Sequence, residues 1–136
     1  MSEISPRFLL VLAVAIFSGP KNKITLEICQ DKKCVKTTLV AEKNGTWKVF
    51  NNEKLFSMTV KPDKQRKCFY EFLSDSGNHV TLDLTQQVPG IEKLNPSKLQ
   101  KETFKTKDGA RLEMERREGK LRLKFSDRPA EEIIIF

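Results

Sequence analysis

The sequence predicts an all-β fold, an antiparallel β-sandwich of about eight strands that forms one domain over residues 1–136. After Lys21, apolar and polar residues alternate over short segments, as is typical of half-buried strands. Turn residues separate these segments at intervals of about 8–12 positions, the spacing of sandwich folds. The length of 136 residues suits one domain, and no linker or internal repeat divides the chain.

Each expected strand has its own signal. Ile24, Leu26 and Ile28 alternate with polar residues, and a charged turn at 30–33 leads to β-branched residues at 34–40. Asn44-Gly45, a strong hairpin signal, precedes a strand at 46–50. A ribbon turns at Glu118-Gly119-Lys120. The remaining strands are expected at 55–60, 68–73, 80–84, 112–114 and 121–125, with at most one helical turn at 91–94.

The apolar run Phe8–Phe17 (FLLVLAVAIF) has three interpretations. We favour a central strand buried on both faces, because Pro6 and Gly19-Pro20 bound the run as turn residues. As a helix the run would cover about 15 Å, half of a bilayer core, so no transmembrane segment is expected. The alternative is the apolar part of a signal peptide, in which residues 1–19 would be a cleaved leader.

The cysteines bear on the cellular compartment. Cys29, Cys34 and Cys68 are an odd number, which favours reduced thiols and a cytoplasmic protein, with membrane association open. If the leader is real, Cys29 and Cys34 flank a turn and could form a hairpin disulfide in a secreted protein. Asn44-Gly45-Thr46 would then also be a glycosylation sequon, although the turn interpretation needs no secretion.

The net charge of +7 favours partners with negative surfaces, namely anionic lipid headgroups, an acidic protein or nucleic acid. Glutamates interleave with the second of two basic clusters and neutralise part of it, and an ordinary solvated surface is the other interpretation. The clusters are Lys61, Lys64, Arg66 and Lys67 in a loop, and Arg111, Arg116, Arg117, Lys120, Arg122 and Lys124 in the last ribbon.

Nucleic acid is the less favoured partner. The first basic cluster precedes Phe69, Tyr70 and Phe72, and basic residues beside aromatic rings can bind single strands by charge and stacking. These rings alternate along one strand, however, so at least one side of that strand is expected to be core.

No enzyme is expected. His79 is the single histidine and has no nucleophile motif beside it, and the glycines form no phosphate-binding loop. The cysteine spacing lacks the second pair that a structural zinc site would need. We therefore expect no catalytic residue, metal or cofactor.

The segments also have a family-like order. An apolar first segment at 8–17 precedes Ile24–Thr38 (ITLEICQDKKCVKTT), a strand, a basic turn and a strand. Asn44-Gly45-Thr46-Trp47 is followed by the strand at 55–60, and Leu121–Phe125 is the closing strand. This order resembles a divergent C2 domain, the eight-stranded sandwich of synaptotagmin-like proteins. The resemblance implies a basic strand surface that contacts acidic lipid headgroups.

Calcium-dependent C2 domains hold the ion with several aspartates from two loops. Here Ser18–Lys23 has no acidic residue, and Ser74–His79 offers Asp75 alone. We therefore expect a calcium-independent, non-enzymatic module for protein interaction or for docking to anionic membranes. The alternative is a small secreted β-domain that acts as an extracellular binding protein.

The chain ends in Glu131–Phe136 (EEIIIF), whose apolar side chains should not stay in water. They are expected to form an edge strand of the sandwich. Otherwise Ile134 and Phe136 have the spacing of a docking peptide that adds as a strand to a groove. A third interpretation is that the strand continues in a larger protein.

Overall fold

The structure, a computed structural model, describes residues 5–19, 22–51 and 57–136. Residues 1–4 of the proposed leader, the expected turn after Asn51 and the start of the strand expected at 55–60 lie outside these ranges. Within them, the chain is mostly antiparallel β-structure, so the all-β prediction is confirmed at that level.

Ten antiparallel strands form a single sheet in the order β6-β5-β4-β3-β2-β1-β10-β9-β8-β7. This differs from the predicted sandwich of about eight strands, because the first and last strands pair with each other and join all strands into one layer. The strands are β1 (Lys23–Gln30), β2 (Lys33–Ala41), β3 (Trp47–Asn51), β4 (Ser57–Pro62), β5 (Phe69–Ser74), β6 (His79–Asp83), β7 (Lys101–Lys105), β8 (Arg111–Arg117), β9 (Lys120–Phe125) and β10 (Glu131–Ile135).

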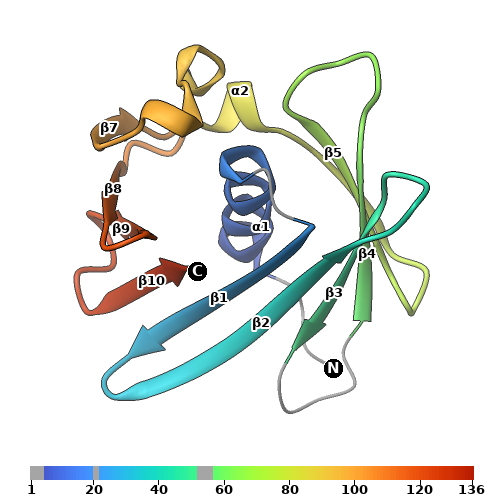
Figure 1. Ribbon diagram of the computed structural model, residues 1–136, viewed down its shortest axis with the longest axis horizontal. Coiled ribbons are helices and arrows are strands. Elements are labelled where there is room, and N and C mark those ends of the chain that lie inside the picture. Colours follow the sequence, from blue (N-terminus) through green and yellow to red (C-terminus); the bar gives the residue numbers. More distant parts are fainter. Residues whose placement is uncertain (1–4, 20–21, 52–56) are drawn as a thin grey trace.

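The sheet curls around the helix α1 (Pro6–Ser18), which lies in the centre of the molecule (Figure 1). Seven consecutive residues, Leu9 to Ala15, are buried, so the middle of the helix is enclosed on every side. The inward residues of the strands join them in one hydrophobic core. We use the word shell for the ten-stranded sheet together with the segments that complete it around α1.

Burial of the run Phe8–Phe17 was predicted correctly, but the prediction of a strand was wrong. A strand at the centre of the shell would have no neighbour to take its backbone hydrogen bonds, whereas a helix satisfies them internally. The local sequence supports the helix as well. Ser5 is the N-cap, whose side chain accepts a hydrogen bond from the Arg7 amide, and Pro6 occupies the first turn. No helix in the described part of the chain is long and apolar enough to cross a membrane.

The side of the shell between β6 and β7 is covered by short helical segments (Figure 1). These are α2 (Leu84–Gln87), η1 (Ile91–Lys93) and η2 (Pro96–Lys98). Leu84, Ile91 and Leu99 point into the core from this stretch and are fully or almost fully buried. The single helical turn expected at 91–94 is therefore present as a 3₁₀ turn.

The predicted hairpin turns are confirmed. Asp31 and Lys32 both have positive φ angles and form a two-residue turn between β1 and β2. Asn44 orders the next turn, because its side-chain oxygen accepts from the Thr46 amide and hydroxyl. Gly45 has a φ angle of 90°, which favours glycine. The turn at Glu118-Gly119 joins β8 to β9.

Candidate functional site

The second basic cluster lies mainly on the outer face of β8 and β9. Leu112 and Met114 of β8 and Leu121, Leu123 and Phe125 of β9 are buried, so the residues between them point outward. The neighbouring edge strand β7 adds two lysines at outward positions, because its partly buried Phe104 pairs with Leu112. We call this surface the basic face; it comprises Lys101, Lys105, Arg111, Arg117, Lys120, Arg122 and Lys124.

Cations stand directly opposite each other at two points of the basic face. Lys105 pairs with Arg111 across β7 and β8, and Arg117 pairs with Lys120 across β8 and β9. Such like-charge cross-strand pairs are destabilising. Glu113 and Glu115 lie between them and pair with Lys124 and Arg122 in the register. The basic face thus carries seven cations against two carboxylates.

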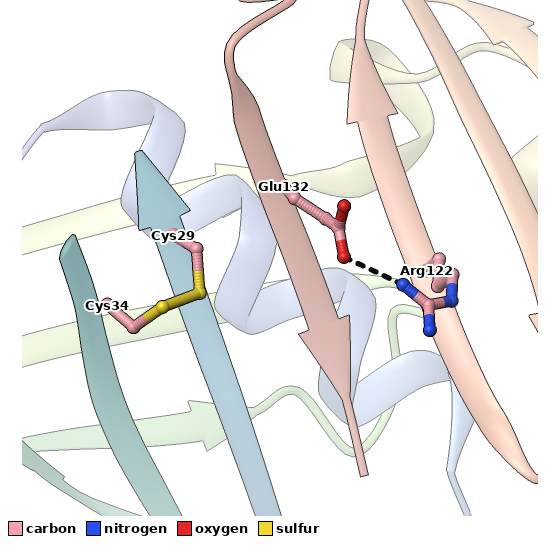
Figure 2. Close-up of a disulfide and its surroundings, with 4 residues drawn as sticks. All are labelled: Cys29, Cys34, Arg122 and Glu132. Carbon is pink, nitrogen blue, oxygen red and sulfur yellow. Dashed lines mark hydrogen bonds and ion pairs between the residues drawn. A yellow bond between two sulfur atoms is a disulfide. The ribbon is translucent and has the colours of Figure 1, made fainter. Parts of the chain in front are cut away.

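Arg122 is the member of the basic face that makes an ion pair within the described residues. Its Nη1 donates to Oε1 of Glu132 on β10 over 2.7 Å (Figure 2). The Nε atom of Arg122 is buried without a hydrogen-bond partner. Lys120 has its ammonium 5.0 Å from the centre of the Phe136 ring. The other five cations make no ion pair within 4.0 Å and no ring contact with the described residues, so their charges can meet an external anion.

Arg116, which the sequence placed in the same cluster, lies on the opposite side of β8. It lies two positions after the buried Met114, so it faces the interior with it, and its Nη2 donates to the carbonyl oxygen of Pro96 over 3.2 Å. Arg116 is therefore not part of the basic face. It lines a cleft that is described with the interior of the shell below.

The first basic cluster is separated from the basic face and is largely engaged within the molecule. Five strands stand between β4 and β8 in the sheet order. Arg66 stacks on the ring of Phe69 at 4.0 Å and pairs with Asp83 at 3.6 Å. Lys67 Nζ donates to the carbonyl oxygen of Glu92. Lys61 and Lys64 remain exposed, so this cluster offers two cations.

An acidic residue shapes the loop of the first cluster. The Asp63 carboxylate accepts hydrogen bonds from the backbone amides of Gln65 and Arg66, both over 2.8 Å. These bonds lower the pKa of Asp63, the Arg66 amide having the larger effect. The loop therefore carries a stable negative charge between its cations.

The aromatic residues proposed to stack on nucleic acid are turned away from solvent. Tyr70 and Phe72 point into the core, and burial raises the pKa of the Tyr70 hydroxyl. Phe69 is half-buried beneath Arg66. This arrangement leaves no exposed ring of the three beside the basic loop.

His79 lies at the start of β6, with its Nε2 3.2 Å from Oε2 of Glu71 on β5. Both side chains are about half exposed, in keeping with a surface cross-strand pair. No group of three or more histidine, cysteine or acidic side chains suited to a metal ion occurs among the described residues.

Of the C-terminal residues proposed for docking, Ile134 belongs to β10, and Phe136 directly follows this strand, with its amide donating to the carbonyl oxygen of Thr25. This strand lies between β1 and β9 and is paired on both sides, so the prediction of an edge strand was wrong in position. Ile133 and Ile135 point into the core, whereas Ile134 pairs with Glu27 and Arg122 on the outer side. Docking through Ile134 and Phe136 by strand addition would first require β10 to leave the sheet.

Cys29 and Cys34 form a disulfide on the outer side of the β1–β2 hairpin (Figure 2). The two residues are directly opposed in the register. The prediction of three reduced thiols was therefore wrong for this pair. Cys68 is a free thiol, and burial raises its pKa.

Lys101 and Lys105 are the members of the basic face that sequence reasoning missed. Residues 86–100 have no regular pattern, and β7 carries a single inward apolar side chain, Phe104, so the strand was not expected. The alternation Lys101-x-Thr103-x-Lys105 was the available signal. Comparison of the chain with models of known families and with curated proteins gives no match.

Proposed function

We propose that the protein is a non-enzymatic binding module that docks to anionic membranes through the basic face. The observation that carries the proposal is the pair of like-charge contacts, Lys105 with Arg111 and Arg117 with Lys120. Cations held together at fixed positions repel one another in the free protein. A nearby anionic surface offsets that repulsion by attracting every one of these cations, so their placement favours the bound state.

The strength of docking follows from the number of free cations. Each lysine or arginine near an anionic lipid surface contributes about 1 kcal/mol. Five free cations would give about 5 kcal/mol, which Glu113 and Glu115 reduce. The attraction is direct and needs no bridging ion, which supports calcium-independent docking. Docking through the basic face does not depend on a C2 sandwich, because the charges lie on neighbouring strands of the single ten-stranded sheet.

Co-sedimentation with vesicles tests the proposal. The protein is expected to pellet with phosphatidylserine vesicles, to stay in solution with phosphatidylcholine vesicles, and to be released by high salt but not by a calcium chelator. Replacing Lys105→Glu and Arg111→Glu together should weaken binding by at least about thirtyfold, from about 1 kcal/mol for each of the two cations lost, because the two new carboxylates also repel the anionic surface.

A matched control comes from the other basic cluster. Lys61→Glu with Lys64→Glu changes the net charge equally, but these residues lie five strands away from β8. Binding of this variant should change by less than about threefold, because charges beyond a screening length contribute little. Equal losses in both double variants would show attraction by net charge alone. Absence of binding to any anionic vesicle would leave an acidic protein as the partner to test.

A second candidate is an extracellular binding protein whose leader, residues 1–19, is removed. The disulfide between Cys29 and Cys34 favours it, because disulfides form and persist in oxidising compartments. Expression through a secretory pathway followed by N-terminal sequencing decides this. A mature chain that starts near Pro20 supports the candidate, and a secreted chain that retains α1 rejects it.

A further inference from the structure

The helix α1 fills the shell without being part of its hydrogen-bonded frame. Its backbone bonds are internal, and in the described chain its polar contacts with the shell are those of Arg7 with Asp108 and Asp127. The ten strands pair from β6 through to β7 with no contribution from α1 (Figure 1). The helix therefore supplies apolar volume to an interior that the strands enclose.

The space that α1 occupies is elongated and apolar. Thirteen helical residues are about 20 Å long, and a helix with its side chains is about 10 Å wide. The wall is apolar and comes from both halves of the sheet; Leu39, Val49, Val60, Phe72, Met114 and Leu123 all point inward and are buried. A long alkyl chain would find the same apolar surroundings as the helix.

The wall carries a polar side chain at each end of one row of cross-strand neighbours. One row of inward residues crosses five strands in the register: Thr37, Leu26, Ile135, Leu121 and Arg116. Its three middle members are buried and apolar, and its two ends are polar. Thr37 is fully buried, yet its hydroxyl has no hydrogen-bond partner. A buried hydroxyl without a partner is destabilising, so α1 does not match the polar part of the wall at Thr37.

A cleft opens beside the last turn of α1. It has a volume of about 600 Å³, and Phe17, Leu121 and Ile135 line it together with Arg116. The Arg116 guanidinium donates a hydrogen bond to the carbonyl oxygen of Pro96 through Nη2, and its other N–H groups can serve a ligand. Arg116 is the cation among the described residues that line this cleft. An apolar wall with one guanidinium at its mouth suits an amphipathic anion.

We infer that the interior of the shell is a binding chamber for a long-chain fatty acid, and that α1 is its internal occupant. The alkyl chain takes the place of α1, and the carboxylate accepts hydrogen bonds from Arg116 at the mouth. The chamber becomes available when α1 moves out or is removed. The inference is independent of the basic face, since none of its residues belongs to that surface.

The test uses full-length variants in which α1 is made a poor occupant. Leu12→Glu places a carboxylate at a fully buried position in the middle of the helix. Arg7→Glu is a second variant, which sets a negative charge against Asp108 and Asp127 and leaves the buried apolar residues of α1 unchanged. Thermal unfolding, followed by the fluorescence of the buried Trp47, is measured with and without hexadecanoate.

Both variants are expected to melt below the wild type and to regain much of the difference with hexadecanoate, by mass action on the folded state. Wild type and Ile91→Ala should gain little, because Ile91 is a buried residue of η1 whose loss destabilises the protein but leaves α1 in place. Where Leu12→Glu folds only with ligand, the folded fraction recovered on refolding is the readout. Equal stabilisation of all four proteins, or rescue of neither α1 variant, overturns the inference.

The end group is tested in the Leu12→Glu protein. Arg116→Gln should raise the hexadecanoate concentration for half-maximal rescue about tenfold, the loss of one hydrogen bond to a charged group. Rescue by hexadecan-1-ol, which has no charge, should not change. If Arg116→Gln affects both ligands equally or affects neither, the carboxylate does not lie at Arg116 and that assignment fails.

Discussion

Arg7 and Asp127 are joined by two parallel hydrogen bonds although 120 positions separate them in the sequence, with Nη1–Oδ1 at 3.1 Å and Nη2–Oδ2 at 2.9 Å. Nη2 also donates to Asp108 over 3.2 Å, and the guanidinium lies 4.0 Å from the centre of the Phe125 ring. The Arg7 side chain is 10% exposed. The start of α1 is thereby tied to two turns at one end of the shell.

Replacing Arg7 should weaken the attachment of α1 to these two turns. We expect Arg7→Gln to lower the free energy of unfolding by about 1–3 kcal/mol, the range for hydrogen bonds to charged groups. Denaturant unfolding followed by Trp47 fluorescence measures the loss. Arg128→Gln is the matched control, because its contact with Glu131 is an exposed pair at 3.8 Å and should be worth less than about 1 kcal/mol. Equal effects would show that the Arg7 contacts add nothing beyond surface charge.

Low pH should weaken the contacts of Arg7 with Asp127 and Asp108. The hydrogen bond from Arg7 lowers the pKa of Asp127, and the hydrogen bond from the Thr106 hydroxyl is the main cause that lowers the pKa of Asp108. A carboxyl whose pKa is lower when folded contributes stability above its unfolded value of about 3.9 and loses it as the pH falls through the folded value. Melting temperatures of wild type and Asp127→Asn should therefore differ by a constant amount above about pH 5 and converge as the pH falls through the lowered pKa of folded Asp127. A difference that stays constant down to pH 2 would contradict this origin.

The disulfide between Cys29 and Cys34 should contribute about 2 kcal/mol, the value expected from the chain entropy of a very short loop. Unfolding in denaturant with and without reductant measures this difference. The double variant Cys29→Ser with Cys34→Ser should unfold at one midpoint under both conditions. Thiol titration of the oxidised, unfolded wild type should find one reactive group, Cys68; three would show that the disulfide does not form.

Neighbouring isoleucines of β10 should respond differently to truncation. Ile133→Ala removes a side chain that is 1% exposed in the core, and should cost about 2–5 kcal/mol. Ile134→Ala removes one on the outer side of the same strand, and should cost about 1 kcal/mol or less. Similar costs for the two would contradict the register of β10 between β1 and β9.

The sequence predicted the strands well where a local pattern decided the structure. The strand at Ile24–Ile28 and the turn at Asn44-Gly45 each depend on a few adjacent residues. They can therefore be predicted without knowledge of the rest of the chain. The run Phe8–Phe17 is different, because a continuous apolar segment fits a buried helix as well as a buried strand. Which one forms depended on whether a strand neighbour was available, and that is a property of the whole sheet.

Only part of the basic face could be predicted from the sequence, for a related reason. Arg122 and Lys124 lie on the same side of β9, as the alternation of residues 121–125 in the sequence indicates. Arg116 was grouped with them because it is near in sequence, although its position in β8 turns it inward. Lys101 and Lys105 reach the same surface through the pairing of β7 with β8, which no local pattern encodes.

The order of the strands also dictates how this protein must fold. Strands β1 to β6 are each adjacent to the next in sequence, and so are β7 to β10, so both series can form from local hairpins. The one pairing that unites the two series is β1 with β10, for example Leu26 with Ile135. Closing so long a loop carries a large entropic cost and places this step late. During synthesis the two half-sheets can therefore form in turn, but the ring of strands around α1 is completed only after residue 135 has left the ribosome.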